Sequence, residues 1–379
     1  MNFDLDETDL LVRDTARSYA QGSIAPRAAE IDREGTIPPA ILKGLAALGL
    51  MGVSAPEAYG GAGAGTVAYS LALTEVARAC ASTAVTMAVT NMVGEVIARF
   101  GTEEQKRASI PRFCDGSFPG AFALSEVGAG SDPGGMATTA TRDGDHWVIN
   151  GTKQWISHGD TSGVLITWAR TGGPGPKGLS CFLVPGDAPG LSVAGLEHKM
   201  GLLGSHTASL VYENVRLPAD ALLGDEGMGF RIAMMALDGG RIGIASQALG
   251  IAEAAQEAAI AYSKERAQFG KAIAEFQAIQ WMLADSRVEL DAMRLLALQA
   301  ASLKQRGLPF TKEASMAKVF ASEKAWAICN RAVQIHGGYG YTREFPVERH
   351  LRDVRVTQIY EGTSEVQRVV ISRSLLRDA

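Results

Sequence analysis

The residue best suited to chemistry is Glu361, which lies between Tyr360 and Gly362 near the end of the chain. Ser364 and Gln367 have the spacing of a helix-capping box, so the sequence predicts that a helix begins at Ser364. Glu361 then lies in the loop before that helix, beside a glycine that lets backbone approach a ligand closely. Desolvation beside apolar side chains would raise the pKa of this carboxyl and make it a usable base near neutral pH. Taken alone, such a glutamate is more often a solvated partner of the helix dipole.

A second polar segment, Phe122 to Asp132, precedes the first expected strands. Its glycines expose backbone N–H groups, and Ser125 and Ser131 add hydroxyls, a combination that suits a polar heterocycle or a phosphate. Without further context we interpret it as a polar turn between domains. Two other glycine-rich segments fit no nucleotide motif: no strand precedes the one at 60–63, and the lysine in 173–178 is not followed by Ser or Thr.

The composition is that of an ordinary soluble enzyme. Of the 379 residues, 46% are hydrophobic and 20% are charged, and the formal net charge is −5, so no nucleic-acid surface is expected. The length favours two or three domains. The four cysteines lie far apart without a CxxC pair, which indicates reduced, buried thiols. The six histidines show no paired ligand spacing, so no metal site is predicted.

The charge near the N-terminus and one apolar segment bear on location. Asp4, Asp6, Glu7 and Asp9 give the N-terminal region the wrong charge for a secretory or mitochondrial leader. The uncharged segment Ala79–Gly94 is shorter than the roughly 20 residues that a membrane span needs, and it is rich in Ser and Thr. We therefore expect a buried helix there and a soluble, cytoplasmic protein that does not bind a membrane.

The elements expected from periodicity fall into three regions. Residues 1–118 form an N-terminal helical domain, 119–225 a middle β domain, and 226–379 a C-terminal helical bundle. The expected N-terminal helices are Glu7–Glu34, Pro38–Leu48, Thr66–Ala81, Thr83–Phe100 and Thr102–Cys114, the last opened by a capping box. In the C-terminal region, Ile242, Ala245, Leu249 and Ala252 step by three and four along one long helix, and segments 311–336 and 364–377 complete the set.

The middle region shows short apolar runs separated by Gly and Pro. Asn150-Gly151 lies between two such runs, His146–Ile149 and Thr152–Ile156, and predicts a hairpin with a type I′ turn. Further strands are expected at Gly163–Ala169, Leu179–Val184 and Thr207–Tyr212. This succession favours a small antiparallel barrel or sandwich.

Considered together, five segments in this order and at these separations resemble the acyl-CoA dehydrogenases. These are Phe122–Asp132, Trp155–Ser157, Arg266–Gly270, Gln334–Gly338 and Tyr360–Thr363. The resemblance runs the full chain. It implies an α+β fold with an N-terminal helical domain, a small antiparallel β-barrel and a four-helix bundle. It also implies bound FAD, a homotetramer, and dehydrogenation of an acyl-CoA to the trans-2-enoyl-CoA with electrons passing to electron-transferring flavoprotein.

The resemblance assigns Glu361 the role of the base that removes the pro-R α-proton while hydride leaves the β-carbon for flavin N5. In isovaleryl- and long-chain-type relatives the base comes instead from the residue before the bundle arginine, which is Gly240 here. That leaves Glu361 as the base. Substrate contacts are implied for Ser131, Asp238, Arg241, Tyr360 and Gly362.

The same resemblance implies two sets of FAD contacts. Ser125 would bond the ring edge, and the hydroxyl of Ser157, where relatives often have Thr, would donate toward N5. Arg266 and Gln277 would hold the pyrophosphate and adenosine, partly across a subunit boundary. The full implied set is Phe122, Leu124, Ser125, Gly130, Ser131, Trp155, Ile156, Ser157, Arg266, Gln268, Phe269, Gln277, Gln334, Ile335, Gly337, Gly338, Thr363, Ser364 and Glu365.

Two positions depart from the family pattern. Val127 stands where relatives usually carry Pro, so that turn is less fixed in φ. His336 replaces an apolar residue of straight-chain relatives, and we expect a stacked or hydrogen-bonded core histidine.

The acyl chain and the fate of the electrons leave alternatives open. Segment 237–250 resembles short-chain, butyryl-type enzymes of fatty acid β-oxidation, and Tyr360 leans the same way. Segments 170–178, 334–341 and 371–376 are more similar to isobutyryl-CoA dehydrogenase, an enzyme type of branched-chain amino acid catabolism. 2-Methylbutyryl-CoA is a further branched candidate. A flavin monooxygenase or oxidase on the same fold is a second hypothesis, which the presence of Glu361 disfavours. A non-catalytic acyl-CoA-binding protein is a third.

Overall fold

The computed structural model describes residues 5–377, and its N-terminal part is helical. The helices are α1 (Glu7–Tyr19), α2 (Ala28–Glu34), α3 (Pro39–Ala47), α4 (Gly65–Ala79), α5 (Ala81–Phe100) and α6 (Glu103–Cys114). Thr102 and Gln105 form the predicted capping box of α6. The single helix expected over 7–34 is instead broken by a π-helical turn at Ala20–Ile24 and a 3₁₀ turn at Ala25–Arg27. Pro26, which has no N–H to donate, lies in that break.

Helix α5 contains most of the uncharged segment that we expected to be a buried helix. It is the one helix, among the described residues, whose length and composition would suit a membrane crossing. However, 83% of its most apolar window is buried inside the fold. Asn91, also on α5, accepts a hydrogen bond from Val53 N at 2.8 Å and donates to Leu50 O at 3.0 Å, which fixes the loop after α3.

A seven-stranded sheet follows, built from β1 (Ala121–Ala123), β2 (Thr139–Asp143), β3 (His146–Ser157), β4 (Val164–Arg170), β5 (Leu179–Pro185), β6 (Leu191–Leu196) and β7 (Thr207–Pro218). The strand order is β1-β4-β2-β3-β7-β6, and β5 pairs with β4. Most pairs are antiparallel, but β4 lies parallel to β1 and, at one residue, to β2. The sheet is therefore mixed, which differs from the purely antiparallel barrel expected.

The predicted hairpin at Asn150-Gly151 is wrong. Both residues lie inside the continuous strand β3, where the register against β7 shifts between Ile149 and Gly151, as at a β-bulge. Asn150 Oδ1 accepts from Asn214 N at 2.7 Å across that irregularity. The turn between β2 and β3 instead contains Gly144, whose φ of 63° is left-handed. A tertiary pairing with β7 thus overrides the local turn preference of Asn-Gly.

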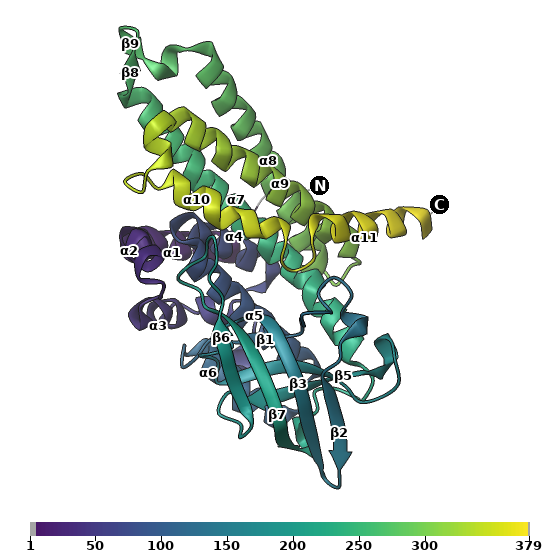
Figure 1. The fold of residues 1–379 in the computed structure, drawn as a ribbon. Coiled ribbons are helices and arrows are strands. Elements are labelled where there is room, and N and C mark those ends of the chain that lie inside the picture. Colours follow the sequence, from purple (N-terminus) through teal and green to yellow (C-terminus); the bar gives the residue numbers. More distant parts are fainter. Residues whose placement is uncertain (1–4, 378–379) are drawn as a thin grey trace.

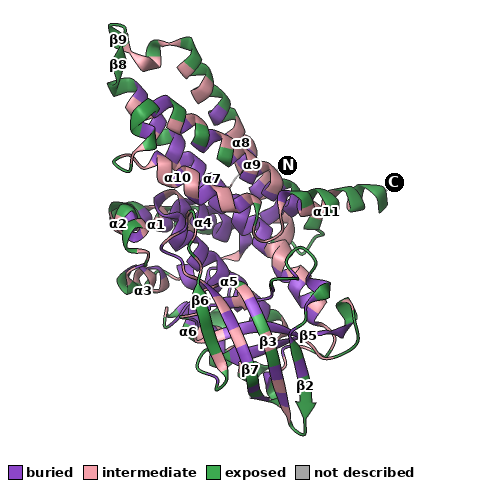
Figure 2. Ribbon diagram, in the orientation of Figure 1, coloured by how far each residue is buried: buried purple, intermediate pink, exposed green. Residues whose placement is uncertain are grey.

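The C-terminal part is a helical bundle of α7 (Gly229–Glu265), α8 (Gln277–Gln305), α9 (Thr311–His336), α10 (Val347–Arg355) and α11 (Ser364–Arg377). A two-stranded hairpin, β8 (Ala267–Gln268) with β9 (Lys271–Ala272), lies at one end of α7 and α8, far from the start of α11 (Figure 1). Helix α7 contacts α4, α5, α8 and α9, and Figure 2 shows that α4, α5 and much of α7 are buried. The three-part fold expected from the resemblance is confirmed.

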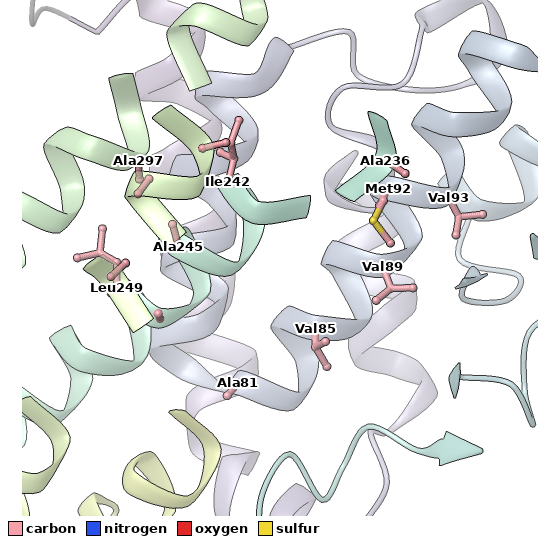
Figure 3. Packing of buried hydrophobic residues seen from close by; sticks show 14 of the residues in the cluster. Ala81, Val85, Val89, Met92, Val93, Ala236, Ile242, Ala245, Leu249 and Ala297 are labelled. Carbon is pink, nitrogen blue, oxygen red and sulfur yellow. The ribbon is translucent and has the colours of Figure 1, made fainter. Parts of the chain in front are cut away.

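The core joins the N-terminal helices to the bundle. The predicted stripe on α7 is confirmed, because Ile242, Ala245, Leu249 and Ala252 are all buried. Figure 3 shows Ile242, Ala245 and Leu249 of this stripe together with Ala81, Val85, Val89 and Met92 of α5, which belong to the same hydrophobic cluster. Burying a Val, Leu or Ile side chain contributes about 1.5–3 kcal/mol each, so α7 is held firmly against α5. This packing fixes where the glycine pair in the middle of α7 faces.

Candidate active site

The loop before α11 holds Glu361 in an uncommon backbone conformation. Glu361 has φ 51° and Gly362 has φ 92°, so two consecutive residues are left-handed. A non-glycine residue with such a φ persists only where its surroundings enforce it. Gln367 Nε2 donates to Gly362 O at 2.8 Å, and Lys318 Nζ on α9 donates to the same oxygen at 2.7 Å. These two bonds hold the turn.

Helix α11 begins at Ser364 as predicted, but its cap is different. Thr363 Oγ1 accepts the hydrogen bond from Val366 N at 3.3 Å, so Thr363 is the capping residue. The side chain of Gln367 turns toward the carbonyls of Glu361 and Gly362. The Ser-x-x-Gln spacing therefore predicted the start of the helix correctly. The capping residue is Thr363, one position before the predicted Ser364.

The carboxylate of Glu361 is desolvated. Its Oε2 is buried and has no hydrogen-bond partner among the described residues. Burial raises the pKa of Glu361 from 4.5 to about 7, and the positive charges of Lys318 and Arg241 oppose that rise. At neutral pH this carboxyl is therefore near its midpoint, which suits a group that accepts a proton and later returns it.

The carboxylate lies against a glycine of α7. A Cβ placed on Gly240 would lie 2.1 Å from Glu361 Oε2 and 3.3 Å from Met92 Sδ. Any side chain at position 240 would thus displace the carboxylate. Position 240 is the one implied to supply the base in some relatives. Here it is a glycine, and the Glu361 carboxylate occupies the space that a side chain would fill.

Two of the implied substrate-binding residues, Asp238 and Arg241, flank Gly240 on α7 and form an ion pair. Arg241 is buried, and its Nη1 donates to Asp238 Oδ1 at 2.5 Å and to Ser315 Oγ at 3.2 Å. Asp238 also accepts from Thr311 Oγ1 at 2.6 Å. Arg241 lowers the pKa of Glu361, so the charge of this residue acts directly on the candidate base.

The phenol beside the base is also fixed. Tyr360 donates its hydroxyl to Gln247 Oε1, and Gln247 Nε2 donates to Ala81 O at 3.2 Å. Burial raises the pKa of Tyr360 well above its usual value, so the phenol stays neutral. Tyr69 of α4 lies close by, since a Cβ on Gly243 would be 2.8 Å from its hydroxyl. Sequence reasoning missed Tyr69, Gln247 and Lys318, whose only signal is a polar group on a buried helical face.

The first group of implied flavin-binding residues lies on neighbouring segments of the β domain. Phe122 in β1 packs on Trp168 at 4.3 Å between ring centroids, and Ser125 O accepts from Gln154 N at 2.9 Å. Leu124 and Ile156 are buried, whereas Gly130 and Ser131 are exposed and Ser157 is half-buried. Trp155 is 60% exposed and has φ 65°, so its indole stands clear of the sheet. These segments present hydroxyls and an exposed aromatic face, which suits a planar heterocycle.

A buried ion pair joins the two segments. Lys153 Nζ donates to Glu126 Oε1 at 2.9 Å and to Leu124 O at 3.0 Å, and both side chains are buried. Glu126 also accepts from Ala137 N and Thr138 N. Burial lowers the pKa of Lys153 to about 8, which the Glu126 charge opposes. The pair fixes the loop that carries Ser125 and Ser131 against β3.

The second group lies at the other end of the bundle. A pocket of about 510 Å³ there is lined by Tyr262, Arg266, Gln268, Ile273, Ile335, His336, Gly337, Gly338, Tyr339 and Thr342. Gln334, Gln277 and Phe269 are exposed around it. His336 stacks on Tyr262 at 4.3 Å and its Nδ1 lies 2.7 Å from Ala332 O, which confirms the expected core histidine. Arg266 follows Arg241 by 25 positions, or roughly 37 Å along α7, and Figure 1 shows this end of the bundle far from the sheet that carries the first group.

Comparison with known proteins identifies the class. Three family models match the chain: the acyl-CoA dehydrogenase N-terminal domain over residues 6–117, the middle domain over 121–215 and the C-terminal domain over 227–376. The chain therefore belongs to the acyl-CoA dehydrogenase family. It is an oxidoreductase, and FAD is the cofactor of this family.

Individual relatives agree over the whole chain. The short-chain specific acyl-CoA dehydrogenase of Bos taurus mitochondria is 49% identical over 99% of this chain and 91% of its own. The structure of butyryl-CoA dehydrogenase from Megasphaera elsdenii superposes with a TM-score of 0.97 at 42% identity and covers 100% of both chains. A chain in the structure described as the electron transferring flavoprotein of Acidaminococcus fermentans gives 0.98 and 42%, also over 100% of both.

The residues present fit FAD. The far pocket combines the Arg266 guanidinium, the amide of Gln268 and the exposed backbone of Gly337 and Gly338, a donor set suited to a pyrophosphate. Its aromatic wall of Tyr262, His336 and Tyr339 suits an adenine. The loop of Ser125 and the indole of Trp155 suit the ring system, as described above.

The pKa of Glu361 predicts how the stability of the fold depends on pH. Because the folded-state pKa of about 7 exceeds the ordinary 4.5, the fold loses stability as pH rises from about 4.5 to about 7, and the full cost remains at higher pH. We expect Glu361→Gln to be more stable than wild type at pH 8 by on the order of 2 kcal/mol, with a smaller difference at pH 5. Thermal unfolding of both FAD-saturated proteins at the two pH values measures this. An equal difference at both would contradict the raised pKa.

Proposed function

We propose that this protein oxidises a short-chain acyl-CoA to its trans-2-enoyl-CoA, with Glu361 as the base that removes the pro-R α-proton. The observation that carries the proposal is the buried, unpaired Oε2 of Glu361, held against Gly240 with a pKa of about 7. FAD, when bound, accepts the hydride that leaves the β-carbon. The other steps belong to residues of the chain.

Proton removal requires that the acidity of the thioester α-proton and the basicity of Glu361 be brought closer together. The α-proton of a thioester is a far weaker acid than an ordinary glutamic acid of pKa about 4.3, so the site must close that gap from both sides. Desolvation strengthens Glu361 as a base. The Glu361 backbone N–H, presented by the left-handed turn, would donate to the thioester carbonyl and stabilise the developing enolate. Since Asp238 pairs with Arg241, whose charge acts on Glu361, the two residues would border the CoA chain beside the base.

Replacing the base isolates its role. We expect Glu361→Gln to retain FAD and to bind butyryl-CoA, but to lose at least 10³-fold in the rate of anaerobic flavin bleaching, because the amide cannot accept the α-proton. Stopped-flow absorbance at the flavin band measures the rate. Near-normal bleaching would place the base elsewhere. Rapid peroxide formation by the wild type, with oxygen as sole acceptor, would favour an oxidase instead.

A straight short chain is the better candidate substrate. The relatives named for short-chain and butyryl-CoA substrates support it, as does Tyr360, whose hydroxyl is fixed on Gln247. A single methyl contact changes specificity by only about 1–3 kcal/mol, so isobutyryl- or 2-methylbutyryl-CoA from amino-acid breakdown is the alternative.

A panel of substrates decides between them. We expect butyryl-CoA to bleach the flavin with a higher kcat/KM than isobutyryl-, 2-methylbutyryl-, isovaleryl- or octanoyl-CoA under anaerobic conditions. A preference for any branched member would overturn the straight-chain assignment. Adding purified electron-transferring flavoprotein, the acceptor we propose from the Acidaminococcus similarity, should restore the yellow flavin and sustain turnover.

A homotetramer would complete the cofactor site. The two groups of flavin-binding residues lie at opposite ends of the fold, one on the sheet and one beside β8 and β9 (Figure 1), so a second copy would supply Arg266 to a flavin on Trp155. The bundle offers a surface for that copy. Trp281, Val288 and Leu295 of α8 recur every seven residues and are 63%, 70% and 50% exposed, an apolar stripe typical of helix pairing. The expected cytoplasmic location stays a prediction.

A charge on this stripe tests the assembly. We expect Val288→Lys to lower the molecular mass in solution below that of four chains and to lose FAD during gel filtration, because burying a lysine in an apolar interface without an opposite charge is costly. Light scattering and the flavin-to-protein absorbance ratio measure both effects. Val193→Lys on the exposed strand β6 is the matched control and should change neither. A Val288→Lys protein that keeps both its mass and its FAD would contradict the proposed interface.

A further inference from the structure

Lys318 is a buried lysine that neither composition nor motif explains. It lies on the inner face of α9 among Ala314, Ala317 and Ala321, and it is fully buried. Its Nζ donates to Gly362 O at 2.7 Å. No carboxylate forms an ion pair with it within 4.0 Å among the described residues. A buried ammonium group costs several kcal/mol unless an opposite charge lies near, so its retention requires a reason.

The charges that face Lys318 identify its counter-charge. Burial lowers the pKa of Lys318 to about 8, and Glu361 is the main charge that opposes this fall. Glu365 and Glu323 act in the same direction more weakly, and Arg241 acts against them. From the other side, Lys318 is the largest influence that lowers the pKa of Glu361, ahead of Arg241. The phenols of Tyr69 and Tyr360, also near Glu361, stay neutral because burial raises their pKa.

We propose that Lys318 is a positioning residue for the base: its ammonium group holds the Gly362 carbonyl, and its charge favours the ionised form of Glu361 in the resting enzyme. The first action keeps the turn at Glu361 and Gly362 left-handed, with the carboxylate on Gly240. The second offsets part of the desolvation of a carboxylate that has no hydrogen bond at Oε2. This inference rests on the proposed role of Glu361.

The two actions can be separated because a second residue shares the first. Gln367 Nε2 donates to the same Gly362 oxygen at 2.8 Å but carries no charge. Loss of Gln367 should therefore loosen the turn and leave the ionisation of Glu361 unchanged. Loss of Lys318 should loosen the turn and also raise the pKa of Glu361.

The test is the pH profile of kcat/KM for butyryl-CoA, because its acid limb reports the pKa of the base in the free enzyme. We expect Lys318→Met to move this limb up by about one pH unit while FAD content stays that of the wild type. Lys318→Arg should keep the limb near its wild-type position. Gln367→Met should lower kcat without moving the limb. An unmoved limb in Lys318→Met overturns the proposal.

Controls separate this inference from the proposed function. Lys312→Met removes a half-exposed lysine of the same helix that pairs with Glu313, and its profile should match the wild type. If Lys318→Met does not fold, Lys318→Gln removes the same charge and faces the same criterion. If Glu361→Gln still bleaches the flavin, the proposed base is wrong. If Glu361→Gln is inactive but the limb of Lys318→Met is unmoved, only the role of Lys318 is wrong.

Discussion

The structure depends on one balance, the desolvation of the Glu361 carboxylate against the two positive charges beside it. Burial alone would raise the pKa of this carboxyl further and favour the protonated form, which is inert as a base. Lys318 and Arg241 restrain the rise, and the result is a pKa of about 7. The same charges are costly to bury, and each is held by hydrogen bonds, Lys318 to Gly362 O and Arg241 to Asp238 and Ser315. The site is therefore a set of mutually dependent buried charges.

The fold supplies this balance by bringing three helices to one point. Helix α7 contributes Gly240, whose lack of a side chain makes room for the carboxylate, and Arg241 on the next position. Helix α9 contributes Lys318 from its buried face, and the start of α11 contributes Gln367. Packing of α7 on α5, whose buried side chains are drawn in Figure 3, fixes the position of α7 and hence of this glycine. A shift of any one helix would move a charge relative to the carboxylate and alter its pKa.

Sequence alone predicted the features that local chemistry determines. The 3.6-residue stripe of α7, the capping box at Thr102 and the loop position of Glu361 follow from nearest neighbours along the chain, and all three agree with the structure. The Asn150-Gly151 turn failed because β3 pairs with β7 through that point, a contact that no local pattern encodes. The short strands β1, β2 and β6 were missed for the same reason, since pairing defines them more than composition does. Lys318 was missed because a lysine on a helix is normally solvated, and its carbonyl partner lies 44 positions away. The sequence also did not indicate that the two groups of flavin-binding residues lie at opposite ends of the fold, because their separation depends on how the long helices pack.

The most direct test of the account is an infrared titration of Glu361 in the FAD-bound enzyme. A protonated carboxyl absorbs near the carbonyl region, and the difference between wild type and Glu361→Gln assigns the band to this residue. The account predicts that the band disappears as pH rises, with a midpoint near 7, because the carboxylate is desolvated in the folded protein. A midpoint near 4.5, the ordinary value for glutamate, would show a solvated side chain and contradict the central claim.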